Sequence, residues 1–255
     1  MDSQLRERTV VILGTFSTTI QNLILSLTAQ GADVALVDKD AVKAQKFCQN
    51  VNDQREANDK LGRAVAIETK LDSENSIKDG LGKAAQTFGS IDIFIDAMMS
   101  NEPTPLPQGQ ETIAWDELLH QNLKVSLMAT QFVAHFLRGR KRGRIVYLLN
   151  EATVRGNTQD ALAAATRTGL IGMAKALGRQ MQEFNVTVNC LSLGLTEEYL
   201  QGHFPDAPTI KEALEKMKSI EPGVRITGPD KISNALLFLC GTGGSAITGQ
   251  HISIT

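Results

Sequence analysis

The stretch that decides the fold runs from Arg144 to Gln182 and reads RIVYLLNEATVRGNTQDALAAATRTGLIGMAKALGRQMQ. Residues 145–149 form a continuous apolar run, which is typical of a strand buried on both faces of a sheet. A polar segment over 150–159 predicts a loop, and Asp160 is a suitable N-cap for a long helix over 161–181. Small residues recur along that helix, including Gly169 and Gly172. Because an internal glycine costs a helix about 0.5–1 kcal/mol, we expect another backbone to approach this face.

The rest of the chain alternates strand and helix patterns with connections too long for hairpins. This alternation predicts a single α/β domain over 1–255, built on a doubly wound parallel sheet with helices on both faces. The long excursion over 192–222 is expected to be a lid or an interface segment. Strands are predicted over 9–13, 33–37, 64–68, 91–97, 145–149, 186–191 and 251–254, and helices over 18–30, 40–58, 72–88, 112–121, 122–138, 161–181, 209–220 and 228–240.

Composition excludes several classes of function. The formal net charge of -2 provides no long-range field that would recruit nucleic acid or anionic lipid. No apolar run reaches the roughly 18 residues that span a bilayer, and the N-terminus lacks the apolar core of a signal peptide. The three cysteines lack metal-ligand spacing and lie in apolar contexts. We therefore expect a cytoplasmic protein with buried free thiols that binds no metal, nucleic acid or membrane.

The strand ending at Asn150 and the small-residue helix after it resemble the core of the short-chain dehydrogenase/reductase family. Thr248-Gly249-Gln250 and Val188-Asn189-Cys190 resemble two further landmarks of that family, so the resemblance covers nearly the whole chain. It implies a Rossmann-like fold and NAD-dependent oxidoreductase chemistry. In the family, the strand ends in a catalytic serine, and the helix carries a tyrosine with a lysine four residues later.

The positions that match this catalytic set read Asn150, Ala163 and Arg167. Alanine has no ionisable proton, and arginine effectively never deprotonates, so neither performs acid–base work. Asn122 matches the family's helix asparagine, which holds a water for a proton relay. The same residue could equally serve as a helix N-cap or at a helix kink. We therefore expect no intact catalytic set in this chain.

The positions that would bind the dinucleotide are also altered. The family's G-x-x-x-G-x-G pattern reads Gly14, Thr18 and Ile20, which places side chains where the backbone must approach the phosphates. Asp38 ends the second strand, where a carboxylate would hold the ribose, but aspartate is also a common turn residue there. Lys70 replaces an aspartate that the family often places beside the adenine.

The fourth strand normally ends N-N-A-G in the family and here reads Asp96-Ala97-Met98-Met99. We expect the two methionines to project into the space of the nicotinamide ribose, as filler, as an apolar plug or as a soft contact surface. The resemblance therefore implies that this chain binds no cofactor and that NAD lies in a partner subunit.

The pattern of losses predicts a non-catalytic subunit, a pseudoenzyme, that assembles with an active NAD-dependent short-chain dehydrogenase paralogue. It resembles the silent partner of hetero-oligomeric hydroxyacyl-CoA dehydrogenases, such as the benzylsuccinate-pathway enzyme of anaerobic toluene breakdown. Family members assemble through the helices over 122–138 and 161–181, so a hetero-tetramer is expected. Two alternatives stay open: an active NAD(P)-dependent oxidoreductase with relocated residues, Tyr199 among the candidates, and a ligand-binding or regulatory module that uses the vacated cleft.

Overall fold

A computed structural model describes residues 5–56, 58–99, 103–105, 115–156 and 161–255. Within these ranges, seven parallel strands form one sheet in the order β3-β2-β1-β4-β5-β6-β7. The strands are β1 (Thr9–Gly14), β2 (Asp33–Asp38), β3 (Ala64–Glu68), β4 (Ile93–Ala97), β5 (Gly143–Asn150), β6 (Val186–Leu193) and β7 (His251–Ile254). The helices are α1 (Thr18–Ala29), α2 (Val42–Glu56), α3 (Glu74–Phe88), α4 (Trp115–Leu119), the π-helix η1 (His120–Lys124), α5 (Val125–Arg140), α6 (Glu151–Arg155), α7 (Ala161–Arg167), α8 (Gly169–Gln180), the 3₁₀ turn η2 (Gln182–Phe184), α9 (Glu197–His203), α10 (Ile210–Ile220) and α11 (Pro229–Cys240).

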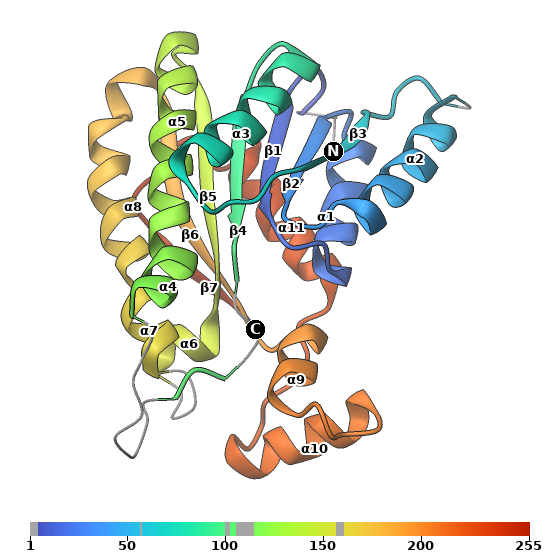
Figure 1. The fold of residues 1–255 in the computed structure, drawn as a ribbon, viewed down its shortest axis with the longest axis vertical. Coiled ribbons are helices and arrows are strands. Elements are labelled where there is room, and N and C mark those ends of the chain that lie inside the picture. Colours follow the sequence, from blue (N-terminus) through green and yellow to red (C-terminus); the bar gives the residue numbers. More distant parts are fainter. Residues whose placement is uncertain (1–4, 57, 100–102, 106–114, 157–160) are drawn as a thin grey trace.

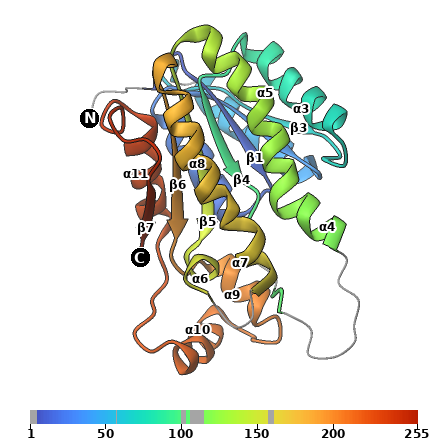
Figure 2. The ribbon, with the colours of Figure 1, turned by 90° about the vertical axis from the view of Figure 1, so that its left-hand side faces the viewer.

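Two apolar layers enclose the sheet, one on each face. Helices α1, α2 and α11 pack on one face, with Leu23 and Leu236 among the buried side chains of that core. Helices α3, α5 and α8 pack on the other face, around residues such as Leu81 and Val133. The two layers are visible on either side of the strands in Figure 1 and Figure 2. The predicted single-domain, doubly wound, Rossmann-like fold is confirmed.

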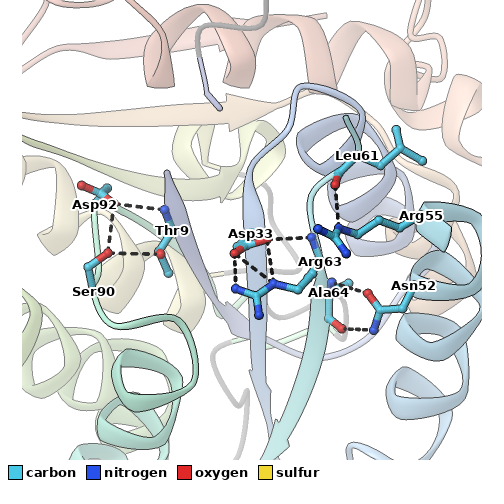
Figure 3. Close-up of polar contacts among 9 residues, drawn as sticks. All are labelled: Thr9, Asp33, Asn52, Arg55, Leu61, Arg63, Ala64, Ser90 and Asp92. Atoms are coloured by element: carbon cyan, nitrogen blue, oxygen red, sulfur yellow. Dashed lines mark hydrogen bonds and ion pairs between the residues drawn. The ribbon is translucent and has the colours of Figure 1, made fainter. Parts of the chain in front are cut away.

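Polar contacts fasten the amino ends of the strands (Figure 3). The buried Asp92 accepts hydrogen bonds from the Thr9 backbone amide at 3.0 Å and from the Ser90 hydroxyl at 3.2 Å. On the neighbouring strand, the Asp33 carboxylate pairs with the Arg63 guanidinium at 2.6 Å. These contacts lie where β1, β2 and β4 begin. They do not involve the opposite, carboxyl edge of the sheet.

The region around the opening stretch differs from the prediction in two places. Residues 151–155 form the short helix α6 where a loop was predicted. The helix expected over 161–181 is divided at Thr168 into α7 and α8. The Thr168 hydroxyl donates to the Ala164 carbonyl one turn earlier, and such back-bonding bends helices.

The other predicted helices are present with shifted bounds. Helix α9 was not predicted. The helix expected to begin at Asn122 is preceded by a π-helical turn over His120–Lys124 that contains this residue. Residues 112–114 of the helix predicted over 112–121 lie outside the described residues. In the described residues, no helix is both long enough and apolar enough to cross a membrane.

The excursion over 192–222 contains α9 and α10, which lie beyond the carboxyl edge of the sheet (Figure 1). The two helices share a small core of their own, formed by Tyr199, Leu200, Ala213 and Met217. Ala152 of α6 packs against this core and connects it to the rest of the domain.

Candidate functional site

The strand order reverses between β1 and β4, and in open α/β sheets ligands bind in the crevice at such a point. Gly14 and Ala97 end these two strands and lie opposite each other. A Cβ atom on Gly14 would lie 2.7 Å from the Ala97 carbonyl oxygen. Close approach of the two strands therefore requires this glycine, independently of any ligand.

The start of α1 differs from the steric block that the sequence predicted. Thr18 is exposed, while the Ile20 side chain is directed into the core. The Ser17 hydroxyl caps the helix by accepting from the Ile20 amide at 3.3 Å. The Thr19 amide donates to the Glu198 carboxylate of α9 at 2.7 Å. The anion on this helix N-terminus is therefore supplied by the chain itself.

Asp38 at the end of β2 is buried, and its carboxylate accepts hydrogen bonds from two backbone amides. Its Oδ2 accepts from the Phe16 amide at 2.8 Å, and its Oδ1 accepts from the Asp40 amide at 3.3 Å. The Phe16 ring packs against the Phe47 ring, with centroids 5.5 Å apart. The carboxylate that would meet a ribose thus shapes the β1–α1 loop in this conformation.

The methionines after β4 do not fill one space together, contrary to the prediction. Met98 packs against the core on the α3, α5 and α8 face, and Met99 packs against the core on the opposite face. Consecutive residues leaving a strand point to opposite faces, which accounts for the split. Lys70, which follows β3, is exposed.

Two of the positions predicted to be catalytic, Asn122 and Arg167, lie in a buried polar cluster. Arg167 donates to the Asn122 carbonyl at 3.1 Å and to the Leu148 carbonyl at 3.3 Å. Burial lowers the pKa of the Arg167 guanidinium, and the nearby negative charge of Asp96 acts in the opposite direction. Asp96 Oδ1 accepts from the Met98 amide, while its Oδ2 has no hydrogen-bond partner among the described residues. The structure thus brings Asn122, Arg167 and Asp96 together.

Ala163 is also buried, at the start of α7. Its amide donates to the Thr104 hydroxyl at 3.0 Å, and the Leu162 amide donates to the Thr104 carbonyl at 3.0 Å. Thr104 therefore contacts the first turn of α7. A methyl group is all that this position offers to a neighbouring substrate.

A cavity of about 570 Å³ lies between the carboxyl ends of β5 and β6 and the α9–α10 excursion. Asn150, Glu151 and Tyr199 line it, together with Arg155 and Arg225. Glu151 is buried and binds Arg155 at 2.8 Å through Oε1, whereas its Oε2 has no partner among the described residues. Asn150 and Tyr199 therefore share one cavity, separate from the buried Arg167 cluster.

The two tyrosines have different environments. Tyr147 is fully buried in β5, where its hydroxyl lies 2.8 Å from the Thr130 hydroxyl. Burial raises its pKa well above 10, so it remains protonated in the core. Tyr199 stacks on His203, with ring centroids 3.9 Å apart, and reaches the cavity.

Glu198 and Glu151 were not predicted as site residues. Glu198 lies 179 residues from its partner, and no local sequence pattern announces such a contact. Glu151 follows Asn150 at the end of a buried strand, and that position alone could have indicated it. No group of three or more potential metal ligands occurs in the part of the chain that the structure describes.

A bound dinucleotide would need an anion site on α1 and an acceptor for the ribose hydroxyls. Both groups are present, but in this conformation Glu198 and the Phe16 and Asp40 amides engage them. The Thr19 amide has a single proton to donate, so Glu198 must leave it before a phosphate can bind there, whereas each Asp38 oxygen keeps a second lone pair for a ribose hydroxyl. One amide that a phosphate would use is thus engaged by a polar contact within the chain, and such a contact is reversible.

Comparisons with known proteins identify this frame. The family model described as enoyl-(acyl carrier protein) reductase matches residues 23–255. The chain is 27% identical over 250 residues to the (2S)-[(R)-hydroxy(phenyl)methyl]succinyl-CoA dehydrogenase subunit BbsD of Thauera aromatica, covering 98% of this chain and 96% of that protein. It is 25% identical over 255 residues to the 3-oxoacyl-[acyl-carrier-protein] reductase FabG of Aquifex aeolicus, covering 100% and 98%. A short-chain alcohol dehydrogenase structure from Sinorhizobium meliloti superposes with a TM-score of 0.84 at 21% identity, covering 99% and 96%.

These comparisons correct the cofactor prediction. Homologues in this family bind NAD(P) themselves, so the expectation of a chain without cofactor, with NAD held only by a partner, is wrong. Of the side chains predicted to block the crevice, Ile20 lies in the core and Thr18 is exposed. With the fold, the crevice and the match over residues 23–255 in agreement, the chain belongs to the short-chain dehydrogenase/reductase family of oxidoreductases.

Proposed function

We propose that this chain is a non-catalytic subunit of an oxidoreductase that acts on acyl thioesters, and that an intact family member in the same assembly performs the proton transfer. The observation that carries the proposal is Ala163, which is buried at the position of the family's acid–base tyrosine. Beside it, the Arg167 guanidinium is bonded to two backbone carbonyls. Loss of a positioned proton donor lowers a rate by about 10²–10⁴-fold.

The names of the relatives support the substrate class. One relative acts on a succinyl-CoA derivative that carries a hydroxyl group, and others are a 3-oxoacyl-[acyl-carrier-protein] reductase and an acetoacetyl-CoA reductase. All three substrates are thioesters with an oxygen function along the acyl chain. The first relative is also named as a subunit, which supports a hetero-oligomer.

The helices α5 and α8 are the proposed contact surface. They run side by side on one face of the molecule (Figure 2). A Cβ atom on Gly172 of α8 would meet none of the described residues within 4 Å, and Leu127 on α5 is 39% exposed. An assembly through these helices accounts for a glycine that packing within the chain does not require.

A second candidate is an active NAD(P)-dependent oxidoreductase whose proton donor has moved to Tyr199. Tyr199 and Asn150 line the same cavity, so a phenol-bearing and an amide-bearing residue border one space. The comparisons favour this candidate over the first, because the relatives are named as reductases or dehydrogenases. The residues Ala163 and Arg167 favour the first candidate, the non-catalytic subunit.

One experiment separates the two candidates. The tagged chain is recovered from its source cells, sized, and analysed for a co-purifying short-chain dehydrogenase; the isolated chain is then assayed for acetoacetyl-CoA reduction with NADH and NADPH. The first candidate predicts a mixed oligomer, with turnover in the assembly and not in the isolated chain. A monomer that turns over alone contradicts it.

Tyrosine variants then test the second candidate. If the isolated chain is active through Tyr199, Tyr199→Phe lowers kcat by about 10²–10⁴-fold, whereas Tyr147→Phe in the core leaves it nearly unchanged. Equal activity of the Tyr199→Phe variant and the unmodified chain excludes the relocated donor.

A further inference from the structure

The carboxylate of Glu198 lies on the first turn of α1. Its Oε1 accepts from the Thr19 amide at 2.7 Å, a length typical of a charge-assisted hydrogen bond. Helix N-termini attract anions, because free amides and the helix dipole point toward them. Helix α1 has no acidic residue in its own first turn, so the Glu198 carboxylate is an anion brought from a remote element.

The element that brings it, α9, also borders the cavity. Glu198 is followed by Tyr199, which lines the cavity and stacks on His203. Thr196 caps α9 by accepting from the Tyr199 amide at 3.2 Å. Helices α9 and α10 share a core, so we expect a movement of α9 to carry α10 with it.

We propose that Glu198 is a latch that holds α9 against α1, and that dinucleotide binding requires this latch to open. The carboxylate and a dinucleotide phosphate would compete for the same amide, since both are anions suited to a helix N-terminus. The Glu198 latch also couples two places: when Glu198 leaves α1, Tyr199 moves with it and the cavity changes shape.

The latch has a measurable consequence for affinity. A protein whose binding-competent state is populated only in part binds its ligand more weakly, in proportion to that fraction. Removing the carboxylate raises the fraction of open molecules, and so it tightens binding without adding a contact to the ligand. This inference concerns binding alone, so it stands apart from the proposed function, which concerns turnover and partners.

The test titrates the full chain with NADH and, separately, with NADPH, by nicotinamide fluorescence and calorimetry. Glu198→Ala removes the contact, and Glu198→Gln keeps the shape without the charge. Glu197→Gln is the matched control, because it removes the same charge from the neighbouring, exposed residue of the same helix. We expect Glu198→Ala to bind at least one dinucleotide about tenfold or more tightly than the unmodified chain, Glu198→Gln to be intermediate, and Glu197→Gln to be unchanged.

Hydrogen exchange gives a readout that does not need the ligand. In the two Glu198 variants, the Thr19 amide and the α9 amides are expected to exchange faster, while the β5 and β6 amides keep their protection. Circular dichroism confirms that the variants fold. The latch is overturned if neither dinucleotide binds any variant, if the Glu198 variants bind like Glu197→Gln, or if the Thr19 amide keeps its protection without the carboxylate.

Discussion

Arg167 carries a positive charge into the interior, at the position that the sequence resemblance predicts to match the family's lysine. Its guanidinium donates to the carbonyls of Asn122 and Leu148, which lie on different elements. A guanidinium presents several donors in a rigid plane, so it can join two carbonyls that a single ammonium would reach less well. The residue therefore has a structural role here: it ties the π-helical turn of Asn122 to β5.

The three cysteines make the stability of the protein sensitive to alkaline pH. Burial raises the pKa of Cys48 to about 11 and that of Cys190 and Cys240 to about 12, from 9.0. The folded state thus favours the neutral thiols. Their stabilisation is complete below pH 9 and is lost as the pH rises from 9 through 11 and 12, because only the unfolded chain releases protons there.

We therefore expect the free energy of unfolding, measured in urea, to be level near pH 8 and to fall steadily between pH 9 and pH 11. Each thiol adds at most about 1.4 kcal/mol per pH unit to the fall. Cys190→Ala should have a shallower slope, because one titrating group is removed. A stability that stays constant from pH 8 to pH 11 would contradict the buried thiols.

At the scale of elements, α8 shows that its glycines serve different purposes. A Cβ atom on Gly178 would lie 2.7 Å from the Thr248 hydroxyl and 2.8 Å from the Gly249 amide. Close packing against the segment before β7 therefore requires Gly178. Among the described residues, nothing lies within 4 Å of a Cβ atom on Gly172, so packing in this part of the chain does not need a glycine there.

The two glycines form a matched pair for substitution. Gly178→Ala should destabilise the isolated chain by about 1–3 kcal/mol through overpacking. Gly172→Ala should stabilise it by about 0.5–1 kcal/mol, because alanine is the better helix former and meets no neighbour. Urea unfolding measures both changes.

The same pair tests the proposed contact surface. If a partner packs on α8, Gly172→Ala lowers the fraction of mixed oligomer in sizing experiments while raising the stability of the isolated chain. If Gly172→Ala leaves the oligomer intact, this face of α8 is not the interface.

At the scale of the whole molecule, Asp92 joins segments that are far apart in sequence. Its Oδ1 lies within 3.2–3.5 Å of the guanidinium nitrogens of Arg8, Arg140 and Arg142, and the carboxylate is 1% exposed. Its Oδ2 accepts from the Thr9 amide. One buried carboxylate thus gathers the starts of β1 and β4 and the end of α5.

We expect Asp92→Asn to destabilise the protein by about 1–3 kcal/mol, because a buried network loses its charge. Asp33→Asn is the control: its ion pair with Arg63 is 27% and 48% exposed, and such pairs contribute about 0–1 kcal/mol. Thermal or urea unfolding measures both variants. Equal effects would show that the three arginines around Asp92 add nothing beyond a surface pair.

Local sequence signals were sufficient for most of the fold. The apolar runs predicted the seven strands of the described sheet to within two residues at each end, because strands buried between two helix layers are predominantly apolar. Helix α3 also has local end signals: Ser73 begins it through a capping box, and Gly89 ends it in the left-handed conformation. These features depend on neighbours in the chain, so the chain alone specifies them.

What the sequence by itself determined is the doubly wound sheet, the identity of the family and the absence of tyrosine at position 163. What only the tertiary structure decided is how the crevice is closed. The bulky Ile20 suggested a steric block, yet its side chain lies in the core. The Thr19 amide donates instead to the carboxylate of Glu198, which is 179 residues away in the sequence. Side-chain direction and contacts between remote elements follow from packing in three dimensions, and no local pattern records them.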